Sequence, residues 1–370
     1  MLLTSSSTFE LSPPMADTGK LAVVLMNLGG PDKPEAVRGF LFSLFNDARI
    51  LTLPQPMRGL LAWIISTSRA PTARKTYGLM GGGSPILPNT QAQGDALTEA
   101  LTGVAAEVRC FIAMRHWQPR TEEAVAQVKA FDPDKVVLLP LYPQFSTTTT
   151  QSALDAWYKA AKRLKFQRPT TALCCYPTNP GFIQANADLI IDALPAAREH
   201  GEPRILFSAH SLPEKIVEAG DPYKWQTERT ADAIREALAA RGEPDLDCVS
   251  TYQSKVGPLP WVGPSTEDEI KRAAEDKVPL IVAPMSFVSE HVETTVEIGI
   301  EYKAEAEALG VPFFMPVPTV GTLAPFIKGL ADLVRQAVEH DGPVMSEEGP
   351  RLCPAGYAQC CQAAFGCGAT

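Results

Sequence analysis

The chain contains 370 residues, 45% of them apolar, and its formal net charge is −9. This length and apolar content are sufficient for more than one hydrophobic core. The acidic balance leaves no basic face large enough to neutralise many phosphates, which excludes nucleic acid as a partner. The sequence holds no apolar run long enough for a transmembrane helix, so we expect a cytoplasmic protein that is at most peripheral on the inner membrane.

Short apolar runs alternate along the chain with longer segments of helical periodicity. Before the first run, residues 1–19 are rich in Ser, Thr and Pro and contain no Lys or Arg, and we expect them to form a disordered tail. The alternation that follows is typical of parallel strands joined by crossover helices. The predicted strands are Leu21–Met26, Val108–Met114, Val136–Leu141, Thr171–Cys175, Ile205–Phe207, Cys248–Tyr252 and Leu280–Phe287.

Amphipathic patterns between these runs predict the helices. They are Thr90–Leu101, Thr121–Phe131, Phe182–Leu194, Trp225–Ala240, Thr266–Glu275 and a last helix, Pro325–His340, which ends at an Asp-Gly-Pro stop signal. The rhythm predicts an α/β protein with two similar halves, residues 20–170 and 171–320. A C-terminal helix segment at 321–345 and a cysteine-rich tail at 346–370 follow them.

Polar or glycine-rich segments come directly after the predicted strands. These segments are Asn27–Pro31, Arg115–His116, Tyr142–Thr150, Ser208–Pro213, Gln253–Pro258 and Ser286–His291. In open parallel sheets, ligands bind beyond the carboxyl ends of the strands, so we expect these segments to line one cleft between the halves. Gly29 and Gly30 lack the spacing of a nucleotide-binding loop, and no nucleotide cofactor is predicted.

A histidine and a row of glutamates are the most informative side chains. His210 follows a strand and is flanked by Ser208 and Ser211, an arrangement that suits a proton acceptor. If the segment after Leu280–Phe287 is α-helical, its glutamates at every fourth position drift by only about 40° per step and form one row. The members of this glutamate row are Glu293, Glu297 and Glu301.

Like charges in such a row repel one another. Either the row is a solvated helix face, or a cation stabilises it, and a divalent metal is the obvious candidate. An adjacent apolar stripe of Val292, Val296 and Ile300 favours the second interpretation, because it places the row at the border of a packed face. A histidine base facing this row suggests metal chemistry on a nitrogen-containing substrate.

Residues 53–65 are apolar almost all round. The segment is either an ordinary buried helix or an interfacial helix that rests on a membrane surface. Trp63, with Arg58 and Arg69 at its flanks, suits the headgroup boundary, and such a segment would border the entrance for a lipophilic substrate.

Several motifs in order along the chain resemble the ferrochelatase family. They are Leu25–Pro31, Gly81–Pro85, Tyr142–Ser146, Ser208–Pro213, Gln253–Pro258 with Trp261, and Phe287–Glu293, within a resemblance that spans roughly residues 20 to 340. The resemblance implies two Rossmann-like, chelatase-type halves with parallel sheets flanked by helices and a cleft between them. It also implies a lyase that inserts Fe(II) into protoporphyrin IX to form protohaem, the terminal step of haem biosynthesis.

Other functions stay open beside this one. One alternative is a chelatase for coproporphyrin or for another pair of metal and tetrapyrrole. A non-catalytic haem or metal carrier is the alternative from another class, and a carrier would need no proton acceptor. The partners expected from the sequence are porphyrin, ferrous iron and a membrane surface through 53–65, and a homodimer is one candidate assembly.

The resemblance also implies roles for individual residues. His210 would act as base and, with Glu293, would hold iron, while His291, Glu297 and Glu301 would form a route for metal or protons. The porphyrin propionates would bind at Arg69, Tyr77 and Ser84, and the rest of the porphyrin site would consist of Leu28, Arg115, Tyr142, Val256 and Trp261. The chemistry is consistent: pyrrole N–H protons need an acceptor, and carboxylates release a hard divalent cation more readily than thiolates do.

This sequence departs from the animal enzymes at named positions. Leu28 stands where those enzymes have Met, and His116 where they have Tyr. Animal members bind a two-iron two-sulfur cluster through three C-terminal cysteines and one internal cysteine, and Thr147 occupies that internal place here.

The tail nevertheless contains enough cysteines for a two-iron two-sulfur cluster. The predicted ligands are Cys353, Cys360, Cys361 and Cys367, with Cys174 or Cys175 as a substitute for one of the adjacent pair. A zinc site and a disordered thiol-bearing tail are the alternatives.

Overall fold

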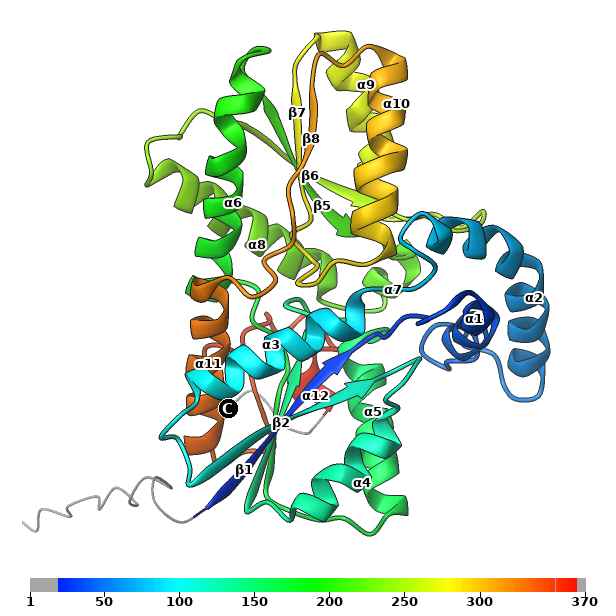
Figure 1. The fold of residues 1–370 in the computed structure, drawn as a ribbon, viewed down its shortest axis with the longest axis vertical. Helices are drawn as coiled ribbons and strands as arrows, with labels where there is room; N and C mark the ends of the chain where they lie inside the picture. The colour runs from blue at the N-terminus through cyan, green and yellow to red at the C-terminus, as the bar shows by residue number, and fades with distance from the viewer. Residues whose placement is uncertain (1–18, 350, 365–370) are drawn as a thin grey trace, which may run out of the picture.

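The computed structural model describes residues 19–349 and 351–364 of the chain, and its strands form a five-stranded and a four-stranded parallel sheet (Figure 1). The strands are β1 (Lys20–Asn27), β2 (Glu107–Met114), β3 (Lys135–Pro140), β4 (Thr170–Leu173), β5 (Arg204–His210), β6 (Asp247–Gln253), β7 (Leu280–Ala283), β8 (Phe314–Pro316) and β9 (Val344–Met345). The two sheets with flanking helices confirm the predicted α/β class.

Helices cover both faces of each sheet. They are the short 3-10 helix η1 (Pro34–Ala36), α1 (Val37–Phe45), α2 (Met57–Gly78), α3 (Ile86–Ala100), α4 (Thr121–Phe131), α5 (Thr150–Arg163), α6 (Pro180–Arg198), α7 (Glu214–Glu218), α8 (Tyr223–Ala239), α9 (Thr266–Asp276), the π-helix η2 (Glu293–Tyr302), α10 (Lys303–Leu309), α11 (Ala324–Glu339) and α12 (Cys361–Ala364).

The first sheet has the strand order β2-β1-β3-β4-β9. Successive side chains of a strand point to opposite faces, and β1 is apolar on both. Leu25 belongs to the same buried cluster as Leu97 of α3, whereas Met26 belongs to the cluster of Leu154 on α5. Helices α3 and α11 therefore cover one face, and α4 and α5 the other.

The second sheet has the order β6-β5-β7-β8. Its central strand β5 also alternates between two packed faces: Leu206 lies in a cluster with Ile270 of α9, and Phe207 in a cluster with Ile234 of α8. In the parallel pairing of β5 with β6, His210 lies opposite Gln253. The last residues of these two strands are therefore neighbours at one edge of the sheet.

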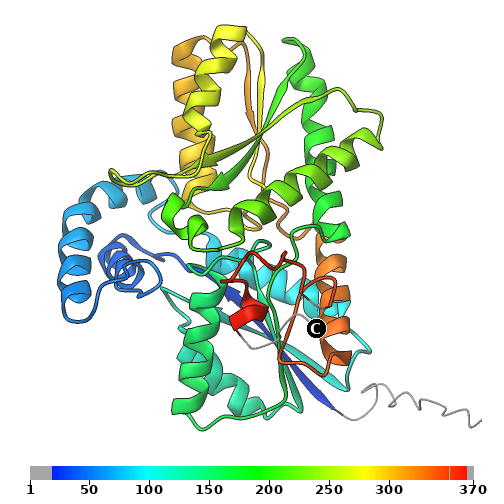
Figure 2. The ribbon, with the colours of Figure 1, turned by 180° about the vertical axis from the view of Figure 1, so that it is seen from behind.

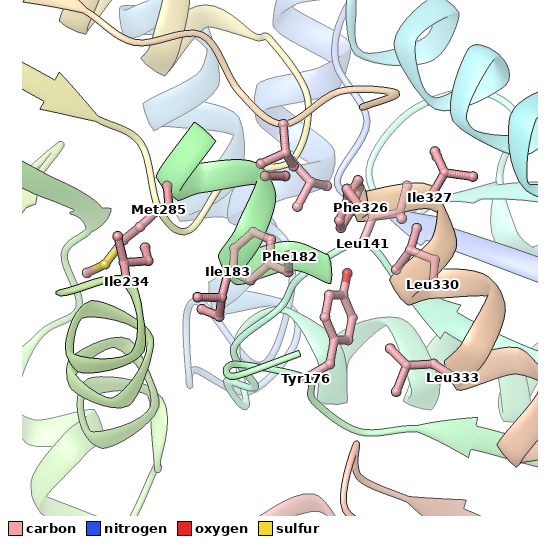
Figure 3. Close-up of a cluster of buried hydrophobic side chains, with 14 of the residues drawn as sticks. Leu141, Tyr176, Phe182, Ile183, Ile234, Met285, Phe326, Ile327, Leu330 and Leu333 are labelled. Carbon is pink, nitrogen blue, oxygen red and sulfur yellow. The ribbon is translucent and has the colours of Figure 1, made fainter. Parts of the chain in front are cut away.

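A shared hydrophobic core joins the two sheets. The cluster includes residues of both sheets, of α6, which packs on the second sheet, and of α11, which packs on the first sheet and on α6 (Figure 3). The rings of Phe182 and Phe326 are 5.9 Å apart between centroids, and Tyr176 approaches Phe182 edge-on at 6.4 Å. Because the core is continuous, the packing holds the two sheets in a fixed relation at the edge where the polar segments meet.

Helices α1 and α2 project from the side of the molecule (Figures 1 and 2). Four apolar side chains of α2 face solvent: Met57 is 60% exposed, Leu60 63%, Trp63 51% and Ile64 48%. Residues 53–65 are therefore not a buried helix. The helical part begins at Met57 and continues through Pro71 to Gly78.

All seven predicted apolar runs contain a strand, and two strands were not predicted. These two, β8 and β9, are three and two residues long, which is too short for a periodic pattern. The predicted run Leu280–Phe287 is a strand only to Ala283, and the last helix is Ala324–Glu339 rather than Pro325–His340.

The chain crosses between the sheets twice. Strands β4 and β9 both pair in the first sheet, so the chain passes to the second sheet after β4 and returns for β9. Strand β4 thus lies on the first-sheet side of the crossing, although the predicted second half begins at residue 171. Division of the chain into domains near residue 170 stays a prediction, and the predicted disordered tail falls, except for Gly19, outside the described residues.

None of the helices in the described part of the chain combines the length and the apolar content that a membrane crossing requires.

Candidate functional site

An imidazole and a carboxylate meet where β5 ends and η2 begins. His210 is the last residue of β5, and its Nδ1 lies 3.0 Å from Oε2 of Glu293, the first residue of η2. The two side chains are 37% and 24% exposed. Because an ionised carboxylate only accepts, Nδ1 donates the hydrogen bond, which leaves Nε2 available to a ligand. This pair confirms that the two most informative predicted residues lie together.

Electrostatics couples the two groups tightly. Partial burial acts to lower the pKa of His210, but the Glu293 carboxylate outweighs it and raises the pKa above its usual value. Burial acts in turn to raise the pKa of Glu293, but His210 and His291 hold that pKa far below its usual range. Each group therefore favours the charged form of the other, and a divalent metal at Glu293 would favour release of a proton from the imidazole.

His291 approaches the same carboxylate from the other side. Its Nε2 lies 3.7 Å from Oε2 of Glu293, and its Nδ1 hydrogen-bonds to the carbonyl oxygen of Ser289 at 3.1 Å. The ring is buried and packs against Phe287. Two imidazoles thus flank one carboxylate at the start of η2. Residues of these types bind divalent first-row metals, although among the described residues no three of them surround a common point.

The second member of the glutamate row is held by three neighbours. Oε2 of Glu297 accepts hydrogen bonds from Ser254 Oγ and, at 3.1 Å, from Gln253 Nε2, and Oε1 accepts from Tyr302 Oη at 3.0 Å. Gln253 Nε2 also lies 3.2 Å from the carbonyl oxygen of Glu293. Burial and the charge of Glu293 raise the pKa of Glu297.

The glutamate row lies on a different type of helix from the one predicted. Residues Glu293–Tyr302 form a π-helix, with i to i+5 hydrogen bonds, rather than an α-helix. The predicted apolar stripe is also only partly right, because Val296 is fully buried but Ile300 is 41% exposed. The row itself runs from the interior to the surface, since Glu301 is exposed.

A second group of predicted residues gathers where β2 and β3 end. Arg115 donates from Nη2 to Asp47 Oδ2 at 2.6 Å and from Nε to Ser152 Oγ at 2.7 Å. Asp47 follows α1, and Ser152 belongs to α5, so Arg115 ties the projecting helices to the first sheet. His116 is fully buried beside this pair, and burial and the charge of Arg115 lower its pKa to about 3.

The remaining residues predicted for the porphyrin lie on several elements. Tyr77 is buried at the end of α2, and burial together with the Glu293 carboxylate raises the pKa of its phenol. Arg69 is exposed on the same helix, with its guanidinium 6.0 Å from the ring centroid of Phe45. Ser84 donates its backbone N–H to the carbonyl oxygen of Pro31 at 2.7 Å. Tyr77 is thus the member of this set that lies near Glu293.

Two aromatic side chains carry polar atoms without partners. Tyr142 Oη and Trp261 Nε1 are buried and have no hydrogen-bond partner within the described residues. Burial, which outweighs the opposing charge of Arg115, raises the pKa of Tyr142. Leu28, which follows β1, accepts a hydrogen bond from the backbone N–H of His116 at 2.9 Å, and Val256 is 40% exposed.

The glycine-rich motif packs directly on the segment after β1. A Cβ atom at Gly83 would lie 2.5 Å from the carbonyl oxygen of Asp32, and one at Gly30 would lie 2.6 Å from Ser84 Oγ. Neither position tolerates a side chain without movement of its neighbour. The two motifs therefore form one tightly packed unit at the end of β1.

Five cysteines cluster between the first sheet and the tail. Cys174 and Cys175 follow β4, and their Sγ atoms are 3.3 Å apart. Cys174 also hydrogen-bonds to Cys361, and Cys353 to both Cys175 and Cys360. All five thiols are buried and free. The cysteines predicted as substitutes thus contact the cysteines of the tail.

These contacts form a chain of thiols rather than a closed set of ligands. Among residues 19–349 and 351–364, no three Cys, His, Asp or Glu side chains surround a point that could hold a metal ion. Cys353 is also held by Gln226, whose Nε2 donates to its Sγ at 3.1 Å. The fourth predicted tail ligand, Cys367, lies outside the described residues.

Sequence reasoning missed several polar side chains of the site. Gln253 ends β6 and Ser254 follows it, and the sequence placed both in a cleft-lining segment but did not predict them as partners of the glutamate row. Asp47 and Tyr302 lie in no such segment. Tyr302 lies five residues after Glu297, and α-helical spacing would place it on a different face.

The same overall fold occurs in a solved chelatase. The structure of SirB from Bacillus subtilis, solved with Fe3+, aligns with a TM-score of 0.50 and 10% sequence identity. The alignment covers 86% of this chain and 96% of SirB. At this identity the likeness shows the fold alone. Together with the imidazole and carboxylate pair at the strand ends, it defines a chelatase-type α/β protein.

Sequence comparison gives the family. The ferrochelatase family profile matches residues 20–338. A ferrochelatase of Caulobacter vibrioides is 50% identical over 346 residues, which are 93% of this chain and 97% of the relative. A ferrochelatase of Wolbachia is 51% identical over 315 residues, 85% of this chain and 98% of the relative. The chain belongs to the ferrochelatase family, which confirms the resemblance read from the motifs.

Proposed function

We propose that this protein is a ferrochelatase, a lyase that inserts Fe(II) into protoporphyrin IX and yields protohaem, the terminal step of haem biosynthesis. The observation that carries the proposal is the His210 and Glu293 pair at 3.0 Å, at the ends of β5 and the start of η2, in a chain of this family. The pair joins a proton acceptor to a metal ligand, and the reaction needs both.

His210 and Glu293 would hold ferrous iron, and His210 would accept the pyrrole protons. Two N–H protons must leave the porphyrin before its four nitrogens can bind a divalent ion, so a nearby imidazole is a suitable base. Iron at Glu293 would remove the negative charge that raises the pKa of His210. Arrival of the metal and release of the imidazolium proton are therefore linked.

The other members of the site would guide ions and hold the macrocycle. A route for metal or protons would consist of His291, Glu297 and Glu301. Their positions support this role, because His291 is buried, Glu297 is partly buried and Glu301 is exposed. Arg69, Tyr77 and Ser84 would bind the propionates, since guanidinium and hydroxyl groups pair with carboxylates. The ring would be bound by Leu28, Arg115, Tyr142, Val256 and Trp261, two of which carry buried polar atoms without partners.

Metal insertion in vitro tests this function directly. Purified protein is incubated anaerobically with Fe(II) and protoporphyrin IX, and haem formation is followed by its absorption spectrum, with coproporphyrin and Zn(II) as parallel substrates. Protohaem formation with a clear preference for protoporphyrin is the expected result. A preference for coproporphyrin would contradict the substrate assignment, and binding without insertion would indicate a carrier.

We also propose that α2 rests on a membrane surface and that the protein is peripheral on the inner membrane. The exposed side chains Met57, Leu60, Trp63 and Ile64 support this, because together they present an apolar patch beside the residues proposed for the porphyrin. Replacing Leu60 and Trp63 by Asp should reduce liposome association in a flotation assay. Unchanged flotation would refute the proposal, and light scattering would test the predicted homodimer.

We further propose that the tail thiols bind a two-iron two-sulfur cluster. The proximity of Cys174 and Cys175 to three tail cysteines supports it, and thiolates are the ligands of such clusters. The described thiols surround no common point, so Cys367 or a shift of side chains would have to complete the ligand set. Iron and acid-labile sulfide analysis of anaerobically purified protein tests this; zinc without either would refute it.

A further inference from the structure

A buried amide joins helix α3 to the segment that precedes η2. Residues 284–292 connect β7 to η2, and we call them the β7–η2 loop. Gln93 lies on α3 and is only 1% exposed. Its Nε2 donates to the carbonyl oxygens of Val288 at 2.7 Å and Gly321 at 3.0 Å. Its Oε1 accepts from Ser289 Oγ at 3.0 Å. Two of these three partners belong to the β7–η2 loop.

The partners of Gln93 also fix the orientation of its amide. An amide nitrogen has two protons to donate, and an amide oxygen only accepts. Both N–H groups of Gln93 are used, because two carbonyl oxygens face the nitrogen. If nitrogen and oxygen were exchanged, the oxygen would face these two acceptors in a buried place, which is costly. The side chain therefore satisfies three groups at once and fits in one way.

The β7–η2 loop extends this contact to His291. Nδ1 of His291 lies 3.1 Å from the carbonyl oxygen of Ser289. A carbonyl oxygen only accepts, so Nδ1 carries a proton, and in the neutral ring the lone pair is on Nε2. This Nε2 lies 3.7 Å from Oε2 of Glu293. Ser289 thus bonds to Gln93 through its hydroxyl and to His291 through its carbonyl, so its position determines where the lone pair of His291 points.

Other contacts of α3 fix the helix to the first sheet. Asn27 is the last residue of β1, and its Nδ2 donates to Oγ1 of the fully buried Thr90 at 3.0 Å. Leu28 follows Asn27, and α3 begins two residues after Ser84. Leu28 and Ser84 are both proposed to bind the porphyrin. One helix therefore connects the porphyrin side of the site with the loop that carries His291.

A second amide on the same face of α3 supports the first. Asn89 precedes Gln93 by one helical turn, and its Nδ2 donates to the carbonyl oxygen of Glu290 at 3.3 Å. This contact is longer than those of Gln93, and Asn89 is only half-buried. Gln93 is therefore the side chain of α3 on which the position of the β7–η2 loop depends most.

We propose that Gln93 is a positioning residue for metal insertion, which orients the Nε2 lone pair of His291 toward iron beside Glu293. The inference rests on the proposed ferrochelatase function. Groups behind a metal ligand fix its tautomer and its direction, so that the lone pair already points at the ion. Gln93 is itself buried, so it acts through the β7–η2 loop and His291 and makes no contact with the reacting atoms.

Gln93→Met tests this role by kinetics. Methionine has a similar length but has no N–H group for the carbonyl oxygens of Val288 and Gly321. We expect kcat/KM for Fe(II) to fall roughly tenfold or more, while the KM for porphyrin stays within about twofold. Wild-type kinetics would overturn the proposal. An equally large rise in the porphyrin KM would overturn it as well, because a generally loosened structure affects both substrates alike.

Gln91→Met is the matched control, because it makes the same substitution on an exposed position of α3. Gln91 Nε2 donates to Oδ1 of Asp95 on the same helix at 2.8 Å. The variant should retain the wild-type kinetics. A loss as large as that of Gln93→Met would overturn the proposal, since any change in α3 would then slow insertion.

Ser289→Ala is a milder second variant, which tests the contact even if Gln93→Met is poorly folded. It removes one hydroxyl and keeps the carbonyl oxygen that accepts from His291. Its loss in kcat/KM for Fe(II) should be smaller than that of Gln93→Met. The double variant should be no slower than Gln93→Met alone, because both changes act on one contact. Additive losses would overturn the proposal.

NMR of the imidazole nitrogens tests the positioning without turnover. At about pH 9, well above the usual pKa of histidine, ¹⁵N-labelled wild-type protein should show His291 with its proton on Nδ1. Comparison with His291→Gln assigns the signals. Gln93→Met should show a mixture of both tautomers, whereas Gln91→Met should match the wild type.

An unchanged His291 ring in Gln93→Met would overturn the proposal, even if insertion were slow. If the ring responds as expected but the wild-type protein inserts no metal, the positioning contact stands and the proposed function fails. The two failures are therefore distinguishable.

Discussion

At the scale of single residues, charge coupling decides what the site can do. His210 and Glu293 shift the pKa of each other in opposite directions, and each favours the charged form of the other. The pair stabilises its own charges only while no cation is bound. A divalent cation at the carboxylate would replace the interaction with the imidazole, which could then lose its proton more easily. The pair therefore connects metal binding with proton transfer.

Removing either partner should strongly slow metal insertion but leave porphyrin binding almost unchanged. We expect His210→Ala and Glu293→Gln to lower the rate of Fe(II) insertion by roughly 10²- to 10⁴-fold, the usual contribution of a positioned base. Porphyrin affinity, measured by fluorescence quenching, should change little because neither side chain is proposed to bind the propionates. Insertion at the wild-type rate in either variant would contradict the assignment.

The raised pKa of His210 predicts how the stability of the folded protein changes with pH. Its pKa is raised in the folded protein, so the stability that it contributes is present below its unfolded pKa and is lost as pH rises through the folded value. The pKa of Glu293 is lowered, so its contribution is lost as pH falls. The pair should therefore stabilise the fold between about pH 4.3, the usual value for Glu, and the raised pKa of His210.

NMR titration of the His210 ring checks this. The midpoint should lie above the usual value of about 6.5 in the wild-type protein and should fall in Glu293→Gln. The stability loss of Glu293→Gln, measured by urea unfolding, should be larger at pH 6 than at pH 9. An unchanged midpoint in the variant would show that the carboxylate does not set the pKa.

At the scale of helices and strands, the sequence predicts what burial controls. Every predicted apolar run contains a strand, because parallel strands are buried on both faces and their side chains record this directly. The glutamate row was predicted from its four-residue spacing, which keeps side chains near one face of a helix. The π-helix was not, because hydrophobic periodicity reports which face is packed and not which backbone hydrogen bonds form. The partners of Glu297 were missed with it, since Tyr302 contacts Glu297 only in the wider helix.

The contact between α6 and α11 gives a prediction about stability. A Cβ atom at Gly181 would lie 2.1 Å from the carbonyl oxygen of Pro325 and 3.0 Å from the backbone of Gly329. Both obstacles are backbone, so the helices would have to separate. We expect Gly181→Ala to lower the free energy of unfolding by about 1–3 kcal/mol. Chemical denaturation measures it, and Gly78→Ala, which meets no atom within 4 Å, is the control that should not be destabilised.

At the scale of the whole molecule, the segment after α11 connects the two sheets a second time. Strand β9 pairs with β4 in the first sheet, while the N–H of Gln359 donates to the carbonyl oxygen of Gly220, between α7 and α8. The ring of Tyr357 packs on Trp225 at 5.8 Å. Figure 2 shows this segment in red tones across the back of the molecule. The thiols lie along this path, so their state is coupled to how the segment docks.

Glu347 should make that docking depend on pH. Its Oε1 accepts hydrogen bonds from Thr178 N at 2.9 Å and Thr178 Oγ1 at 2.6 Å, yet burial raises the pKa of the carboxyl to about 7. A raised carboxyl pKa means that the folded state favours the neutral form. The stability that this group contributes is therefore fully present at acidic pH and is lost as pH rises through about 7.

Tryptic cleavage after Arg351 measures this docking in the intact protein. Glu347→Gln keeps an acceptor oxygen for Thr178 and has no charge at any pH, so its segment should stay docked across the range. The ratio of the wild-type cleavage rate to that of the variant, taken at each pH so that the activity of the protease cancels, should rise as pH increases through 7. A ratio that is constant with pH would show that ionisation of Glu347 does not control the segment.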